Sequence, residues 1–181
     1  MEQYTDQEII DMFQNEDSRN RSIHLMIKQY HVRLYWHIRK IVIDHNDTDD
    51  VLQNTFIKAW KGLGNFKGES KIYTWLFRIG TNEAISFLRT KKTNVSSIHE
   101  IEHHLSNSLS SDSFFGGDEI QLKLQKAILT LPEKQRIVFN MRYYDEIPYN
   151  EMAEILDTSA GALKASYHIA AKKIEAILLN Y

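Results

Sequence analysis

Hydrophobic residues recur at intervals of three and four through the N-terminal half of the chain, which is the period of amphipathic helices. Residues 5–8 resemble a capping box that opens a first helix, and the polar run 44–47 interrupts a second. A third helix is expected to begin at 48–51, with acidic residues where the helix dipole favours them, and a fourth to cover about 72–89. The apolar positions of the second and third helices are Ile27, Tyr30, Leu34, Ile38 and Ile41, then Val51, Phe56, Ala59 and Trp60.

Helical periodicity returns near residue 120 and continues to the C-terminus. Pro132 is well placed in the first turn of a helix, and residues 145–148 form a turn before the last two helices. Those helices lie within 149–178, and Ser159 can cap the second of them after a tight turn at 157–159. Small Ala153 allows the two helices to approach closely, which favours a DNA-binding helix-turn-helix over an ordinary helical hairpin.

Between these halves the composition changes abruptly. Residues 93–119 contain seven Ser, five acidic residues and no Lys or Arg. This composition predicts a flexible acidic linker. The chain is therefore predicted to be all-α, with two small helical domains at 1–92 and 120–181 joined by the linker at 93–119. His99 and His103 have the spacing of a helical zinc pair, but no metal site is expected because the surrounding segment lacks helical periodicity.

Composition narrows the functional classes. The 181 residues include no Cys, which excludes disulfides and thiolate metal sites and suits a reducing cytoplasm. No signal peptide and no membrane-spanning apolar run is visible, so a cytoplasmic protein without membrane insertion is expected. The net charge is −2, but residues 58–92 hold eight Lys or Arg and two Glu. A local basic excess of this kind can bind phosphates, although it is also compatible with an ordinary solvated helix face.

The chemistry of two segments points to DNA. Residues 67–79 mix aromatic with basic side chains, the combination that stacks and holds an unpaired strand. The second helix of the helix-turn-helix would enter the major groove, where Lys164 can donate to guanine or to a phosphate. Ala165 and Ser166 offer few hydrogen bonds to base edges, so recognition is expected to depend partly on duplex shape.

Several segments resemble extracytoplasmic-function sigma factors of the sigma-70 family. Residues 49–60, 66–70 and 73–79 resemble the family's region 2, and residues 131–133 and 149–178 resemble region 4. The resemblance spans nearly the whole chain in the family's order. It implies an initiation subunit of bacterial RNA polymerase whose region 2 binds core polymerase and melts the −10 element, and whose region 4 binds the −35 element.

The resemblance assigns roles residue by residue. Positions that match the polymerase-binding segment are Asp50, Gln53, Asn54, Phe56 and Trp60. A second set matches the family's −10 contacts. It covers the −10 pocket, the melting segment and the basic end that touches duplex phosphates. Its members are Phe66, Lys67, Gly68, Glu69, Ser70, Lys71, Tyr73, Arg78, Asn82, Arg89, Lys91 and Lys92. Candidate −35 contacts are Ser159, Gly161, Lys164, Ala165, Ser166, His168 and Lys172.

The chain also departs from the family pattern. Positions where the recognition helix usually carries arginine hold Ser166, Ile169 and Ala171. At a turn position where the family often has Gly, this chain has Asp157. At the position after Gly161, where the family has Thr, it has Ala162. These differences concern the −35 sequence and the strength of that contact.

No Gly-x-x-x-x-Gly-Lys-[Ser/Thr] motif for ATP, no catalytic residues and no cofactor site are expected, so the chain is predicted not to be an enzyme and to melt DNA by binding alone. The family implies core RNA polymerase and promoter DNA as partners and an anti-sigma factor as a candidate regulator. The acidic linker is interpreted either as a tether or as an occupant of the basic polymerase channel.

Two other functions fit parts of the sequence. A promoter-binding repressor or activator would share the C-terminal motif, but it would not need the aromatic and basic segment at 66–78. A metal-dependent nuclease would use Asp49 and Asp50 or the linker histidines, although paired acids at a helix start are usually caps.

Overall fold

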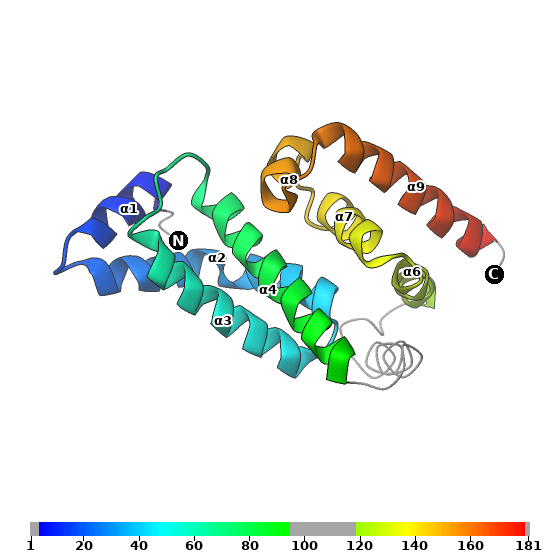
Figure 1. The fold of residues 1–181 in the computed structure, drawn as a ribbon, viewed down its shortest axis with the longest axis horizontal. Coiled ribbons are helices and arrows are strands. Elements are labelled where there is room, and N and C mark those ends of the chain that lie inside the picture. Colours follow the sequence, from blue (N-terminus) through cyan, green and yellow to red (C-terminus); the bar gives the residue numbers. More distant parts are fainter. Residues whose placement is uncertain (1–3, 95–118, 180–181) are drawn as a thin grey trace.

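The computed structural model describes residues 4–94 and 119–179, which are helical with short connections (Figure 1). This confirms the expected all-α class. The predicted linker and its His99/His103 pair fall mostly or wholly outside these residues. The helices are α1 (Asp6–Gln14), α2 (Arg19–Val42), α3 (His45–Leu63), α4 (Ile72–Asn94), α6 (Glu119–Leu129), α7 (Glu133–Tyr143), α8 (Tyr149–Leu156) and α9 (Ala160–Leu179).

Local capping sets the starts of the N-terminal helices. The predicted capping box is present, since the Glu8 amide donates to Thr5 Oγ1 at 3.3 Å and the Thr5 amide donates to Glu8 Oε2 at 2.7 Å. The predicted break at 44–47 is too long, because the Asp44 side chain accepts from the Asp47 amide and α3 already begins at His45. The fourth helix also continues beyond its predicted end, to Asn94.

The first four helices form a bundle around a shared core. Leu34 and Ile38 of α2 are fully buried, as are Ile72 and Leu76 of α4. Gly80 lets α4 approach α2 closely, since a Cβ there would lie 3.0 Å from Leu34 Cδ1. The predicted stripe on α3 divides in two. Val51 and Ala59 are buried, whereas Trp60 is 52% exposed.

The C-terminal helices include the predicted helix-turn-helix. Asp157 ends α8 in the left-handed conformation (φ 49°, ψ 49°), which Asp tolerates better than most residues. Ser159 then caps α9, its Oγ accepting from the Ala162 amide at 3.3 Å. Leu163 and Ala170, seven positions apart, are buried on the inner face of α9. Pro132 lies just before α7, at its N-cap.

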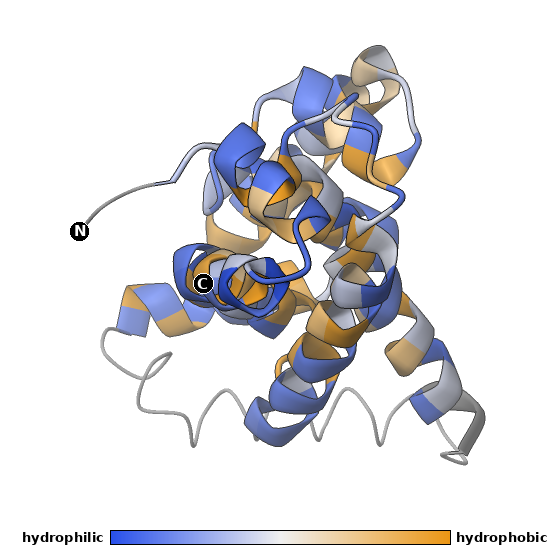
Figure 2. Cartoon of the chain, turned by 90° about the vertical axis from the view of Figure 1, so that its left-hand side faces the viewer, coloured by the Kyte–Doolittle hydropathy of each residue, from blue (hydrophilic) through white to orange (hydrophobic). Residues whose placement is uncertain are grey.

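The two halves of the chain pack against each other. α8 contacts α4, and α7 contacts α2. In Figure 1, α7 and α8 lie beside the bundle of α1–α4, and Figure 2 shows hydrophilic and hydrophobic residues sharing the same helices. One cluster of buried apolar side chains runs through both halves, from Ile9 and Leu34 to Met141, Met152 and Leu163.

Candidate nucleic-acid interface

The loop between α3 and α4 is built on an aromatic pair. The ring of Phe66 packs on the ring of Trp75, with centroids 5.0 Å apart. Gly62 makes room for this pair, because a Cβ there would lie only 3.1 Å from Trp75. Gly68 takes a positive φ of 72°, which lets the chain turn sharply between the pair and the start of α4. Trp75 thus supports the loop from within the chain.

The polar residues of this loop project outward from that support. Lys67, Glu69 and Lys71 are exposed, and Ser70 is partly buried. Lys71 Nζ donates to Glu151 Oε1 of α8 at 2.7 Å. This hydrogen bond and the negative charge of Glu151 raise the pKa of Lys71. The loop therefore offers two lysines for a phosphate, one of them already paired within the chain.

α4 carries one polar face beyond the loop. Arg78, Asn82 and Arg89 are all exposed, and their spacings of four and seven place them on the same side of the helix. The structure thus brings these three predicted contacts into one row. Lys91 pairs with Asp47 of α3 at 2.5 Å. The side chain of Lys92 lies outside the described residues.

Tyr73 is placed differently from the other predicted −10 contacts. It is only 9% exposed, and its ring lies 4.2 Å from that of Phe77 and under the guanidinium of Arg33 at 4.5 Å. Burial raises the pKa of Tyr73. In this conformation the ring forms part of the core, so contact with DNA would require it to move.

The predicted polymerase-binding residues share the outer side of α3. Asp50, Gln53 and Asn54 are exposed, and Trp60 is half-exposed. Phe56 is partly buried, and its ring stacks on that of His31 of α2 with an interplanar angle of 1°. This stack joins the surfaces of α2 and α3.

Two exposed apolar residues of α2 and α3 were not among the predicted contacts. Ile57 of α3 is 41% exposed, and Val32 of α2 is 63% exposed. The available signal for Ile57 was its spacing of four from Gln53 and three from Asn54 and Trp60, which places an apolar side chain among the predicted contacts. Val32 had no such signal, because its exposure depends on how α2 packs.

The predicted −35 contacts lie on the solvent face of the helix-turn-helix. Gly161, Lys164, Ala165, His168 and Lys172 are exposed at helical spacing along α9, and Ser159 is exposed at its start. Ser166 is partly buried. Lys164 Nζ lies 5.8 Å from the centre of the Tyr149 ring. The exposed row contains two cationic side chains and two small residues, which suits phosphate contacts more than extensive base contacts.

Within residues 4–94 and 119–179, no helix is long and apolar enough to cross a membrane. Over the same residues, no group of three or more His, Cys, Asp or Glu side chains is arranged to hold a metal ion.

Comparisons with known proteins agree with this geometry. The model of Sigma-70 region 2 matches residues 26–93, and that of Sigma-70, region 4 matches residues 121–174. The RNA polymerase sigma-H factor of Pseudomonas aeruginosa is 29% identical over 97% of this chain and 95% of its own length. The ECF RNA polymerase sigma-E factor of Escherichia coli K12 is 28% identical over 96% of this chain and 94% of its own.

Solved structures show the same fold. CnrH in complex with the cytosolic domain of CnrY has a TM-score of 0.70, with 22% identity and 96% of each chain covered. The sigma factor RpoE of Bartonella quintana, bound to the anti-sigma factor NepR, has a TM-score of 0.66 at 21% identity, over 84% of this chain and 94% of its own. With both region models matched in order and relatives aligned over almost its full length, the chain belongs to the extracytoplasmic-function group of the sigma-70 family.

Proposed function

We propose that this chain directs core RNA polymerase to promoters and melts the −10 element by binding free energy, without ATP. In this proposal residues 1–92 bind polymerase and the −10 element, residues 93–119 link the domains, and residues 120–181 bind the −35 element. The reaction chemistry belongs to the polymerase, so the chain is an initiation factor with no catalytic residues of its own. It would act in the cytoplasm, where polymerase and promoters are found.

One observation carries the proposal. The chain presents three separate exposed surfaces whose chemistries fit three different partners. The outer side of α3, with Trp60 and Ile57, offers apolar area to a protein, and the loop at 66–71 with the α4 row offers aromatic support and cations to an unpaired strand. α9 offers a helix of major-groove dimensions. A simple repressor would have no use for the first two surfaces.

The energetics of melting fit a pocket of this kind. Flipping a base out of the stack costs about a few kcal/mol, and stacking on an aromatic side chain returns about 1–3 kcal/mol per base. Lys67 and Arg78 are exposed beside the loop and can add phosphate contacts. Captured bases and phosphates would therefore offset the opening of a few base pairs, with polymerase contacts contributing the remainder.

Regulation by an anti-sigma factor is part of the proposal. CnrH and the Bartonella RpoE were solved as complexes with CnrY and NepR respectively. The apolar residues exposed on α2 and α3 of this chain, Val32, Ile57 and Trp60, offer a surface that such a partner could cover in competition with polymerase.

Reconstitution with core polymerase tests the proposal. The purified chain and core polymerase are incubated with a genomic DNA library, and transcript starts are mapped by sequencing. Starts that share upstream elements and depend on the chain support an initiation factor. Binding to duplex sites without any polymerase-dependent start would support a repressor or activator instead.

A further inference from the structure

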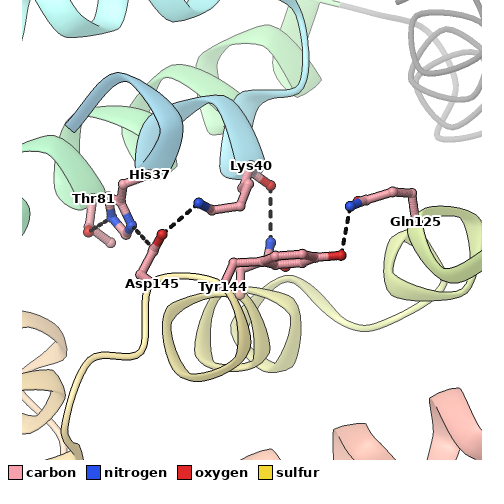
Figure 3. A network of polar contacts seen from close by, with 7 residues as sticks. His37, Lys40, Thr81, Gln125, Tyr144 and Asp145 are labelled. Atoms are coloured by element: carbon pink, nitrogen blue, oxygen red, sulfur yellow. Dashed lines mark hydrogen bonds and ion pairs between the residues drawn. The ribbon is translucent and has the colours of Figure 1, made fainter. Parts of the chain in front are cut away.

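A single carboxylate from the C-terminal half is inserted into the N-terminal bundle. Asp145 lies in the turn between α7 and α8, and its Oδ2 accepts from His37 Nδ1 of α2 at 2.9 Å. Its Oδ1 accepts from Lys40 Nζ of α2 at 2.5 Å. Figure 3 shows Asp145 between these two side chains. His37 is 1% exposed and the Asp145 side chain 9%, so the ion pair is shielded from water.

Neighbouring contacts fix the geometry around this carboxylate. On the far side of the imidazole, His37 Nε2 lies 2.8 Å from Thr81 Oγ1 of α4. Asn140 of α7 donates to the main-chain oxygen of Lys40 at 3.2 Å. The ammonium of Lys40 also lies 5.7 Å from the centre of the Tyr144 ring (Figure 3). Three helices of the two halves, α2, α4 and α7, therefore meet in one polar network.

A second contact between the halves involves the loop at residues 66–71, which we call the −10 loop because the proposed function assigns it to the −10 element. The Lys71–Glu151 pair links the loop to α8. Gly68, Glu69 and Ser70 of the loop line one pocket together with Glu151 and Glu154 of α8. In this arrangement carboxylates of the helix-turn-helix lie where the proposed function places the phosphates of the melted strand.

The packed arrangement is incompatible with a promoter bound at both elements. The two elements are named for positions about 25 base pairs apart, which is about 85 Å of B-DNA at 3.4 Å per base pair. Packed helices have axes only about 8–10 Å apart. Because α8 packs directly on α4, which carries Arg78 and Asn82, α9 cannot reach a −35 element while α4 holds the −10 element.

We propose that the turn bearing Asp145 is a latch, which holds the free chain closed with Glu151 on the −10 loop, and that loading onto polymerase and promoter requires its release. The inference rests on the proposed function, because it assigns the closed form to a state that cannot use the promoter. The exposed side of α3 with Gln53, Asn54 and Trp60 stays open in the closed form, so polymerase can bind there first.

The interface has the features of a reversible contact. Asn140 Oδ1 is buried and has no hydrogen-bond partner among the residues that the structure describes, so separation of the halves would let water reach it. Lys71 is 68% exposed in its pair with Glu151. A polar centre of this kind specifies one register of packing, while its imperfect satisfaction limits its strength.

Distance measurements on the free chain test the latch. The chain has no Cys, so Lys61→Cys on α3 and Glu175→Cys on α9, both at exposed positions, give two unique labelling sites for single-molecule energy transfer. The parent chain is expected to show mainly one population at short distance. Asp145→Asn should raise the ratio of open to closed molecules about tenfold or more, because it removes charge from two hydrogen bonds. Glu151→Gln should raise it about twofold, since its pair is largely exposed.

Glu146→Gln is the matched control, because it removes the same charge from the neighbouring exposed residue and should leave the ratio unchanged. Circular dichroism shows whether each variant is folded, and Glu151→Gln keeps the test decisive if Asp145→Asn unfolds. A parent chain that is mainly open, or folded variants with the parent's distance distribution, would overturn the latch. The distance measurement uses the free chain without polymerase or DNA. Its result is therefore independent of whether transcription assays support the proposed function.

Discussion

Asp145 and His37 are 108 positions apart in sequence, yet the carboxylate of one lies 2.9 Å from Nδ1 of the other. Burial alone would raise the pKa of Asp145, but the hydrogen bond and charge of His37 and the charge of Lys40 outweigh it and hold the pKa below its ordinary value. Asp145 is therefore ionised at neutral pH, and Nδ1 of His37 carries the hydrogen that it shares with the carboxylate. The contact joins the N-terminal half of the chain to the C-terminal half.

This pair predicts how stability depends on pH. A carboxyl group whose pKa is lowered by folding contributes stability that is fully present above its unfolded pKa of about 3.9 and is lost as pH falls through the lower folded value. Asp145→Asn should lower the free energy of unfolding by about 2 kcal/mol at pH 6. Urea unfolding should show this difference shrinking below about pH 4. A difference that stays constant from pH 6 to pH 3 would contradict the assignment, and Glu146→Gln should show little change throughout.

The row on α4 predicts a separation of two activities. Asn82→Ala and Phe66→Ala should both reduce open-complex formation, by about tenfold for Asn82→Ala if one hydrogen bond to a captured base is lost. Polymerase affinity should stay within about twofold, because neither residue lies on the outer side of α3. Phe66→Ala will also lose stability through its contact with Trp75, so Asn82→Ala is the cleaner variant. Asn20→Ala makes the same change at an exposed position of α2 away from this row and is the control, and equal loss of both activities would reject the pocket.

A substitution on the exposed face of α9 should impair transcription from duplex templates only. Lys164→Ala should weaken binding to a duplex −35 element by about five- to tenfold, the loss expected for one charge-assisted contact. Transcription from a pre-melted template should not change. Lys173→Ala removes the same charge from a side chain that bonds to Gln135 instead of lying in the exposed row. Equal loss on both templates, or an equal effect of the control, would count against this division of labour.

Substitutions on the outer side of α3 should lower affinity for core polymerase without affecting DNA binding. Ile57→Ser and Trp60→Ala remove apolar area that is already 41% and 52% exposed, so each should change stability by less than about 1 kcal/mol. Affinity for core polymerase should fall by about tenfold or more if these residues lie at the centre of that interface. Leu179→Ala, at the 79% exposed end of α9, is the control in the same affinity measurement. Unchanged affinity for core polymerase in both α3 variants would show that the polymerase interface does not include these residues.

Two glycines predict stability changes of opposite sign. Gly80→Ala would place a Cβ 3.0 Å from Leu34 Cδ1, and the strain should exceed the gain in helix propensity, for a net loss of about 1 kcal/mol. Gly161→Ala has no atom within 4 Å of its Cβ and should stabilise α9 by about 0.5 kcal/mol. Thermal unfolding of both variants compares them directly. Equal shifts of Tm would show that close packing at Gly80 is not what distinguishes them.

Local sequence signals predicted most of the secondary structure. The Thr5 box, the α2 stripe and the turn before Ser159 each depend on residues a few positions apart, so periodicity and capping rules were enough. The start of α3 was placed too late because Asp44 was counted with the polar break, whereas its side chain caps the helix. Such a cap depends on the backbone conformation of one residue, which periodicity does not report.

Tertiary contacts were beyond the reach of the same signals. Phe77 lies four positions after Tyr73 on the same helix, but nothing in the local pattern shows that Arg33 of α2 covers the Tyr73 ring. For Asp145 the sequence predicted only a turn. Its contacts with His37 and Lys40 of α2 could not be predicted, because these partners lie about a hundred positions earlier. The resemblance named Arg78, Asn82 and Arg89 for separate roles, and the structure shows that they share one exposed row of α4.

Permanganate footprinting tests the central claim most directly. Core polymerase and the purified chain are bound without nucleotides to DNA fragments that carry the mapped starts, and oxidation of unpaired thymines is measured. The account predicts reactive thymines just upstream of those starts with the parent chain, and about tenfold fewer with Asn82→Ala. If polymerase is bound and thymines at every such start remain unreactive, binding alone does not open the strands and the account is wrong.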